Sequence, residues 1–205
     1  MSVSGGKPII VPKPKTANDS IDGFSPDGKQ LVFTRSPSTG GGKPTLMAER
    51  VGGDPPVPLR QSGLSGASVL AAGAFNVQWA PDGRWIAVDN GQKIELVSAK
   101  GGTPRVLVPS LNSGDGFSWS PTSTQLAYVT YVGPGQARLA TVDHQGHRKL
   151  LWNSALNYRT QNSLDGPQWS PDGSKLVFAA NDGSSSSTTY VWVINANGAG
   201  LKKLA

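Results

Sequence analysis

Apolar residues along this chain alternate with polar ones in short runs, and they do not recur at helical spacing over any long stretch. Leu31 and Phe33 lie two residues apart, as do Leu176 and Phe178. A period of two is typical of β-strands, because successive side chains in a strand point to opposite faces of a sheet. The pattern therefore predicts an all-β chain.

A turn sequence of the type Ser-Pro-Asp-Gly precedes these runs. Its proline recurs at Pro26, Pro81, Pro121 and Pro171. An aromatic residue stands two positions before each proline: Phe24, Trp79, Trp119 and Trp169. Proline presets the backbone of the first turn position and Asp-Gly completes the turn, so each copy predicts a β-hairpin. The third copy reads Ser-Pro-Thr-Ser, and we expect its turn to differ.

Each copy continues with a second apolar run, a glycine-rich turn and a last short run, as in YVWVINANGAGLKKLA at 190–205. Four short antiparallel strands that recur about every 40–50 residues indicate β-propeller blades. One such sheet cannot bury both of its faces, whereas blades stacked face to face can. We therefore expect the recurring aromatic residues to pack between neighbouring blades rather than to stack on a ligand.

The repeats divide the chain into blades at about 16–60, 61–109, 110–152 and 153–205. Residues 1–15 match the outer strand of a preceding blade, since SVSGGKPIIVPKP parallels VSAKGGTPRVLVPS. The predicted fold is a β-propeller segment within one domain, 1–205, with four four-stranded antiparallel blades and one orphan N-terminal strand. The unmatched strand suggests that the chain is a piece of a longer propeller. The sequence leaves open whether the ring closes, and an open arc would favour self-association through its exposed blade faces.

The phrases WAPDGRWIAV, WSPDGSKLVF and FSPDGKQLVF, together with VWVINANGAGLKKLA, resemble the repeat of TolB-like β-propellers. These are WD-repeat-like blades with an aromatic-Ser-Pro-Asp-Gly motif, and the resemblance covers nearly the whole chain. It implies a periplasmic or otherwise extracytoplasmic bacterial setting. It also implies a protein partner such as an envelope protein or a lipoprotein.

Charge and composition exclude several classes of function. The net charge is +6, but the 19 basic residues are scattered, whereas a nucleic-acid site needs a basic cluster with interleaved aromatic residues. The chain has no cysteine, no apolar stretch long enough to cross a membrane and no visible signal peptide. We therefore expect neither nucleic-acid binding nor membrane insertion.

Motifs for catalysis or metal binding are weak. The segment DHQGH, from Asp143 to His147, holds both histidines of the chain, but a zinc site needs three or four converging ligands. No Gly-x-Ser-x-Gly motif provides a nucleophile, and Asp27, Asp82 and Asp172 recur as turn formers. We expect no catalytic residue, no metal ligand and no cofactor.

Binding residues are expected on the loop face, where the connections between second and third strands and between blades are long and variable. The candidates on this face are Tyr158, Arg159, Gln161, Asn162, Arg35 and Lys43. The inner strands are expected to line a central channel with polar side chains. The channel candidates are Asp22, Asn76, Gln78, Ser118 and Gln168. An ordinary solvated loop and an ordinary scaffold channel are the alternatives to these two sites.

These features predict a non-catalytic propeller scaffold that mediates protein–protein interaction, as the resemblance to TolB-like proteins implies. Two alternatives stay open. The chain could be the substrate-gating propeller of a prolyl-oligopeptidase-like peptidase, which an adjoining α/β domain with a nucleophile elbow would favour. It could also be the extracytoplasmic sensor domain of a membrane-bound regulator, which an upstream transmembrane helix would favour.

Overall fold

A computed structural model describes residues 15, 17–38, 45–51, 57–58, 76–89, 92–111, 116–133, 136–154, 166–180 and 190–204. The predicted orphan strand at 1–15 lies outside these residues, apart from Lys15. The described part of the chain contains no helix with the length and apolar character that crossing a membrane requires.

The sixteen described strands form four sheets, each with four antiparallel strands in chain order. The first two sheets contain β1 (Ala17–Phe24), β2 (Gln30–Pro37), β3 (Thr45–Arg50) and β4 (Val57–Pro58), and then β5 (Asn76–Trp79), β6 (Trp85–Asp89), β7 (Ile94–Ser98) and β8 (Arg105–Val108). The third contains β9 (Phe117–Trp119), β10 (Gln125–Gly133), β11 (Gln136–Asp143) and β12 (Arg148–Ser154). The fourth contains β13 (Gln168–Trp169), β14 (Lys175–Ala180), β15 (Tyr190–Asn195) and β16 (Lys202–Lys203).

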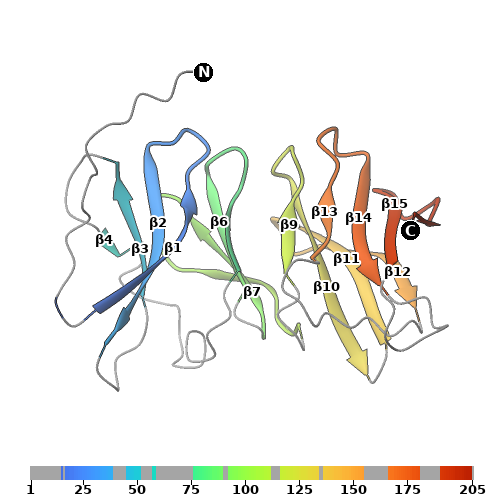
Figure 1. The fold of residues 1–205 in the computed structure, drawn as a ribbon, viewed down its shortest axis with the longest axis horizontal. Coiled ribbons are helices and arrows are strands. Elements are labelled where there is room, and N and C mark those ends of the chain that lie inside the picture. Colours follow the sequence, from blue (N-terminus) through green and yellow to red (C-terminus); the bar gives the residue numbers. More distant parts are fainter. Residues whose placement is uncertain are drawn as a thin grey trace.

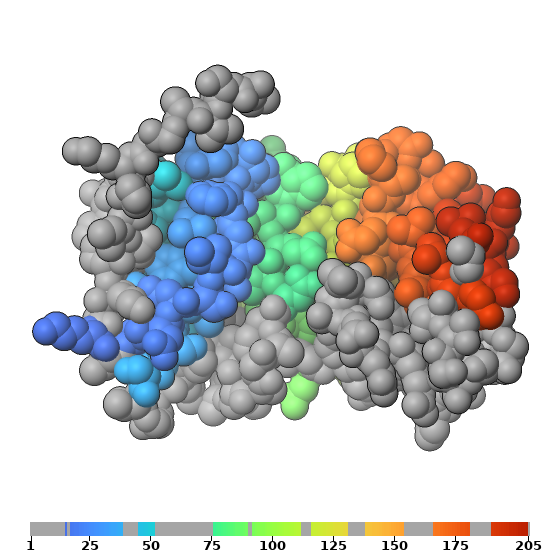
Figure 2. Space-filling view, in the orientation of Figure 1, coloured from blue at the N-terminus to red at the C-terminus, as the bar shows by residue number. Residues whose placement is uncertain are grey.

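The four sheets stand side by side in chain order, from blue to red in Figures 1 and 2. Their first strands are neighbours, because β1 contacts β5, β5 contacts β9 and β9 contacts β13. This is the arrangement of propeller blades around an axis, with the first strand of each blade innermost. The first and fourth blades lie at opposite ends of the molecule (Figure 1). The chain is therefore an all-β propeller segment, as its repeats predict, and its described blades form an open arc, a point that the sequence left open.

Within the described residues, the hydrophobic core consists of three clusters, one at each junction between neighbouring blades. At the 1–2 junction, aliphatic side chains of the first blade meet those of the second: Val32, Leu46 and Ala48 against Val77, Ile86, Val88 and Val97. Trp79 packs against this cluster, Trp119 belongs to the cluster of the 2–3 junction, and Trp169 packs against that of the 3–4 junction. The predicted packing of the tryptophans between blades is confirmed.

Phe24, the fourth member of the aromatic column, departs from this expectation, because its side chain is 59% exposed. The other three aromatic side chains pack against the blade that precedes their own. Phe24 belongs to the first blade of the arc, so no described sheet lies on the side that its ring faces. Its exposure follows from its place at the end of the arc rather than from the repeat itself.

The turns after the inner strands follow one edge of the molecule (Figure 1) and share one hydrogen-bond pattern. The N–H of Gly28 donates to the carbonyl of Ser25 at 2.8 Å, and Ser123 repeats this bond to Ser120 at 2.9 Å. The expectation that the third turn differs was wrong. Ser123 adopts the glycine conformation, with φ of 60°, and its Oγ accepts the backbone N–H of Asp82 at 2.8 Å. Ser123 therefore has a strained backbone, and its side chain accepts a hydrogen bond from the second blade.

Candidate functional site

The predicted channel residues lie on the inner strands, and two of them join neighbouring blades. Gln78 on β5 donates through Nε2 to Asn76 Oδ1 at 3.0 Å and to the carbonyl of Phe117 on β9 at 2.8 Å. Both amide side chains are half-buried. The bond from Gln78 to Phe117 therefore links the second blade to the third, and Asn76 orients the Gln78 side chain.

The other three channel candidates have different surroundings. Asp22 accepts a hydrogen bond from Thr34 Oγ1 at 2.8 Å, and burial raises the pKa of its carboxyl group although that bond opposes the rise. Ser118 Oγ is buried without a partner among the described residues. Gln168 is exposed. The five residues are spread over four blades, so their role in a channel stays a prediction.

Arg35 is the member of the loop-face set that the structure describes. Its Nε and Nη2 donate to the two carboxylate oxygens of Asp19, each at 2.8 Å, and its Cζ lies 5.2 Å from the centre of the Phe33 ring. The hydrogen bond to Asp19 raises the pKa of Arg35 above its ordinary value. This two-point pair fastens β2 to β1. The remaining candidates, Tyr158, Arg159, Gln161, Asn162 and Lys43, lie outside the described residues.

A ladder of indole hydrogen bonds crosses two of the three junctions. Trp119 Nε1 donates to the carbonyl of Gln78, and Trp169 Nε1 donates to the carbonyl of Ser118, both at 3.2 Å. Each acceptor is the residue just before the aromatic residue of the preceding blade. By the same rule, the expected acceptor for Trp79 is the carbonyl of Gly23, the residue just before Phe24.

At the 1–2 junction this bond is missing. Trp79 Nε1 is buried and has no partner among the described residues. The register of β1 against β2 shifts between Ile21 and Gly23, and Gly23 has φ of 152°. A shifted strand displaces its carbonyl groups, which accounts for the loss of the acceptor.

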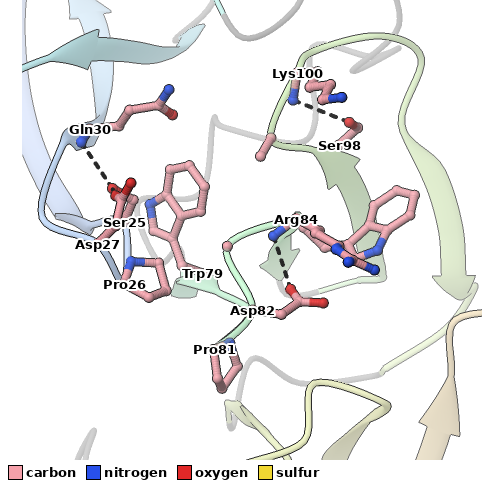
Figure 3. Close-up of a pocket in the computed structure, with 13 residues that line it drawn as sticks. Ser25, Pro26, Asp27, Gln30, Trp79, Pro81, Asp82, Arg84, Ser98 and Lys100 are labelled. Carbon is pink, nitrogen blue, oxygen red and sulfur yellow. Dashed lines mark hydrogen bonds between the residues drawn. The ribbon is translucent and has the colours of Figure 1, made fainter.

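An open groove of about 860 Å³ lies at this junction, on the face of the turns (Figure 3). Three segments form it: the turn of the first blade, the turn of the second blade and the β7–β8 turn. The lining residues are Ser25, Pro26, Asp27 and Gln30, then Trp79, Pro81, Asp82, Gly83, Arg84 and Trp85, and finally Ser98, Ala99 and Lys100. Trp79 stands between the first two segments (Figure 3). We call this space the junction groove.

Side-chain size explains why the junction groove is open. At the 2–3 junction, His144 lies between Trp85 and Trp119, with ring centres 5.6 and 5.5 Å away. The matching positions at the 1–2 junction, by the turn hydrogen bonds, are Gln30 for Trp85 and Ala99 for His144. A methyl group and an amide there leave space that two aromatic rings occupy at the next junction.

The carboxylates of the junction groove are engaged in their own turns. Asp27 Oδ1 accepts Ser25 Oγ at 2.6 Å and the N–H of Lys29 at 3.1 Å, and these bonds lower the pKa of Asp27. Asp82 Oδ1 accepts the N–H of Arg84 at 2.9 Å. Such bonds are typical of aspartate in a turn, so these side chains act first as turn formers.

The cations of the junction groove have no such partners. The side chains of Arg84 and Lys100 are exposed, and neither forms an ion pair with another described residue. The third and fourth blades carry neutral residues at the same two turn positions: Thr124 with Gln145, and Ser174 with Asn197. The junction that lacks its indole hydrogen bond is thus also the one with two unpaired cations.

A second cavity of about 600 Å³ adjoins the junction groove around the turn of the first blade. Asp27 and Gln30 line both spaces. The second cavity adds two cationic residues, Lys29 and Arg50, and the apolar Val51. Together the two spaces, which lie on either side of this turn's shared residues, are lined by more positive than negative side chains.

Sequence reasoning missed this region, because short turns of standard sequence were taken as scaffold. One signal was present in the chain: Arg84 and Lys100 are basic at turn positions where the third and fourth repeats are neutral. The DHQGH segment also has a structural explanation. His147 Nδ1 lies 2.9 Å from Asp143 Oδ2 across an exposed turn, while His144 points to the tryptophans. Within the described ranges no cluster of three or more metal-ligating side chains occurs.

No family model matches the chain. Solved structures share its fold. A protein from Agrobacterium tumefaciens assigned as TolB is 22% identical, with a TM-score of 0.60 over 92% of this chain and 62% of its own. An oligogalacturonate lyase in complex with manganese is 18% identical, with a TM-score of 0.65 over 92% of this chain and 53% of its own. A prolyl endopeptidase is 15% identical, with a TM-score of 0.62 over 92% of this chain and 28% of its own.

These similarities establish a β-propeller fold and nothing finer, because fold alone does not fix function. The chain thus shares its architecture with a TolB protein and with an oligogalacturonate lyase, among other propellers. The chain spans less than two thirds of the length of each of these proteins.

Proposed function

We propose that the chain is a non-catalytic β-propeller scaffold that mediates protein–protein interaction in an extracytoplasmic bacterial setting. The observation that carries the proposal is the junction groove. Its volume of about 860 Å³ lies in the range of ligand pockets, and it combines two tryptophans with two unpaired cations on a rigid frame. Aromatic residues and arginine are the side chains that contribute most binding energy at protein interfaces.

The similarity to TolB supports the setting and the kind of partner, which we propose to be an envelope protein or a lipoprotein. We expect no nucleic-acid binding and no membrane insertion. The end faces of the arc provide a second surface for self-association. Phe24 is 59% exposed at one end, and Val191 on the fourth blade is 45% exposed.

A second candidate is favoured by the similarity to a prolyl endopeptidase, of which this chain matches 28%. In that case the propeller gates substrate entry to a separate hydrolase domain. The reading frame that encodes this chain distinguishes the two functions. An adjoining α/β domain with a nucleophile elbow would favour the peptidase.

The proposed function is tested by partner capture from a bacterial envelope extract. The immobilised chain is compared with the urea-unfolded chain, and with Tyr158→Ala and Arg159→Ala variants of the loop face. We expect a protein that binds the folded chain alone and whose purified form binds it again with a measurable Kd. Recovery of the same proteins by folded and unfolded chain would overturn the proposal, as would peptide hydrolysis by the purified chain. Equal capture by the loop-face variants would remove that face as the binding surface.

A further inference from the structure

We infer that the junction groove binds an extended, acidic segment of a partner protein, with a main-chain carbonyl on Trp79 and carboxylates on Arg84 and Lys100. The inference rests on the proposed function and names the surface and the chemistry of the segment. Three features carry it: an unpaired donor, an excess of cations and a second cavity that shares two lining residues with the groove.

The unpaired donor is Trp79 Nε1. A buried N–H group without an acceptor is rare, because its desolvation is not compensated. The same indole nitrogen is paired at both other junctions, so the repeat itself provides for an acceptor here. The indole nitrogen is buried and faces the turn of the first blade, which lines the groove (Figure 3). A ligand that enters the groove with an acceptor group, such as a peptide carbonyl, supplies the missing partner.

The cations select for acidic side chains. Arg84 and Lys100 come from different turns, and the groove lies between them (Figure 3). Lys29 and Arg50 extend the positive surface into the adjoining cavity. The two carboxylates in this region, Asp27 and Asp82, already accept hydrogen bonds inside their turns. A net charge of +6 on the whole chain favours the approach of an acidic partner as well.

The shape of the site favours an extended segment over a compact molecule. The junction groove and the adjoining cavity follow the turn of the first blade and share Asp27 and Gln30. A short strand of peptide presents carbonyl groups and side chains along such a path, with alternate side chains on opposite sides.

The test uses the purified full chain and a ten-residue synthetic peptide of alternating glutamate and glycine. Matched peptides have glutamine or lysine in place of glutamate. We expect saturable binding of the glutamate peptide that weakens as NaCl rises from about 50 to 500 mM, since the ion pairs are exposed. We expect no binding of the glutamine or lysine peptide. Absence of binding by the glutamate peptide at about 1 mM, near the weak limit of specific affinity, would overturn the inference.

A spectroscopic readout locates the peptide. The chain has six tryptophans, and each gives one indole signal in a nitrogen–proton correlation spectrum. Trp79→Phe keeps an aromatic ring but removes the donor, so the missing signal identifies Trp79. We expect the glutamate peptide to shift this signal downfield and to leave that of Trp169 in place. A shift of other indole signals with Trp79 unchanged would overturn the inference.

Charge variants complete the test. The double variant Arg84→Gln, Lys100→Gln should bind the glutamate peptide at least about tenfold more weakly. The matched control is Arg148→Gln with Lys149→Gln, which removes two exposed cations from β12 and leaves the net charge equal to that of the groove variant. An equal loss of peptide affinity in both variants would show a general effect of charge and would overturn the assignment of the site. Binding of a carboxylate-bearing saccharide, such as an oligogalacturonate, in place of the peptide would overturn the ligand class.

The same variants separate this inference from the proposed function. If a captured partner binds the Arg84→Gln, Lys100→Gln variant as well as the original chain, the junction groove is not its docking site while the scaffold function stands. If no partner is captured but the glutamate peptide binds at Trp79, the groove recognises acidic peptides and the proposed function fails.

Discussion

The 1–2 and 2–3 junctions share the hydrogen bonds of their turns but differ in side chains and in the register of the inner strand of the preceding blade. Both place a tryptophan from an inner strand against the preceding blade, and both are flanked by turns with the same hydrogen bonds. At the 2–3 junction, His144 lies between Trp85 and Trp119, and the Trp119 indole has its acceptor. At the 1–2 junction, Ala99 and Gln30 leave the junction groove, and the Trp79 indole has none.

The difference shows that two junctions between similar repeats can be filled to different degrees. The hydrogen bonds of the turns are kept, because they hold each hairpin together, whereas the inner strand shortens from eight residues in β1 to three in β9. A few side chains that project between blades decide whether a junction is filled or open. Function can therefore differ between repeats that look alike in sequence.

The largest expected effect distinguishes the two tryptophans. Trp119 is 7% exposed inside its cluster, so Trp119→Ala should lower the free energy of unfolding by about 3–5 kcal/mol. Trp79→Ala should cost less, because one side of its ring borders the junction groove and its donor is unpaired. Urea unfolding of the two variants measures the difference. Equal losses would mean that the 1–2 junction is packed as tightly as the 2–3 junction.

The next effect concerns the filler of the closed junction. His144→Ala removes two aromatic contacts, each worth about 0.5–1.5 kcal/mol, and should destabilise the chain by about 1–3 kcal/mol. His147→Ala is the matched control, since its side chain is 81% exposed in the same turn and an exposed ion pair such as that with Asp143 contributes little to stability. Thermal or urea unfolding of both variants measures the two losses of stability. An equal effect of the two would contradict a packing role for His144.

Ser123 tests the hydrogen bond between the second and third blades. Ser123→Ala loses the acceptor for the Asp82 N–H and keeps the positive φ, so a loss of about 1–3 kcal/mol is expected. Ser123→Gly loses the same bond but relieves backbone strain of about 1–2 kcal/mol, and it should be the more stable variant. Urea unfolding gives the order. A glycine variant less stable than the alanine variant would argue against strain at this position.

The smallest expected effect concerns the aspartate of the hairpin turns. The first, second and fourth blades have Asp27, Asp82 and Asp172 at this position, and the third blade has Thr122. Hydrogen bonds from Ser170 and Ser174 lower the pKa of Asp172 from 3.8 to about 2. Because the folded pKa lies below the unfolded one, the ionised form favours the folded state. The stabilisation is complete above pH 3.8 and is lost as pH falls through about 2.

The difference in urea midpoint between the original chain and Asp172→Asn should therefore shrink over this interval of pH. Thr122→Val in the third turn should show no such dependence, because threonine does not titrate. The effect is small because the Asp172 carboxylate is exposed to solvent. A midpoint difference for Asp172→Asn that stays constant down to pH 2 would contradict the lowered pKa.

The strands, the hairpin turns and the number of blades were all readable from the chain. Alternation of apolar residues and the Pro-Asp-Gly turns act locally, so each repeat encodes its own sheet without reference to the others. The packing of Trp119 and Trp169 followed as well, because one blade face can be buried only by the next. The two errors, at Phe24 and Ser123, both depend on a neighbouring blade: one that is absent beside Phe24, and one that supplies a hydrogen bond to Ser123.

Only the tertiary structure decided where a ligand could enter. The junction groove combines segments of two blades, and its opening depends on the side chains of Gln30 and Ala99 at positions that Trp85 and His144 occupy at the next junction. The sequence by itself determined the blades, because strand and turn preferences act over a few residues. The gap between two blades depends on how side chains from both fit together, and no local preference encodes that fit.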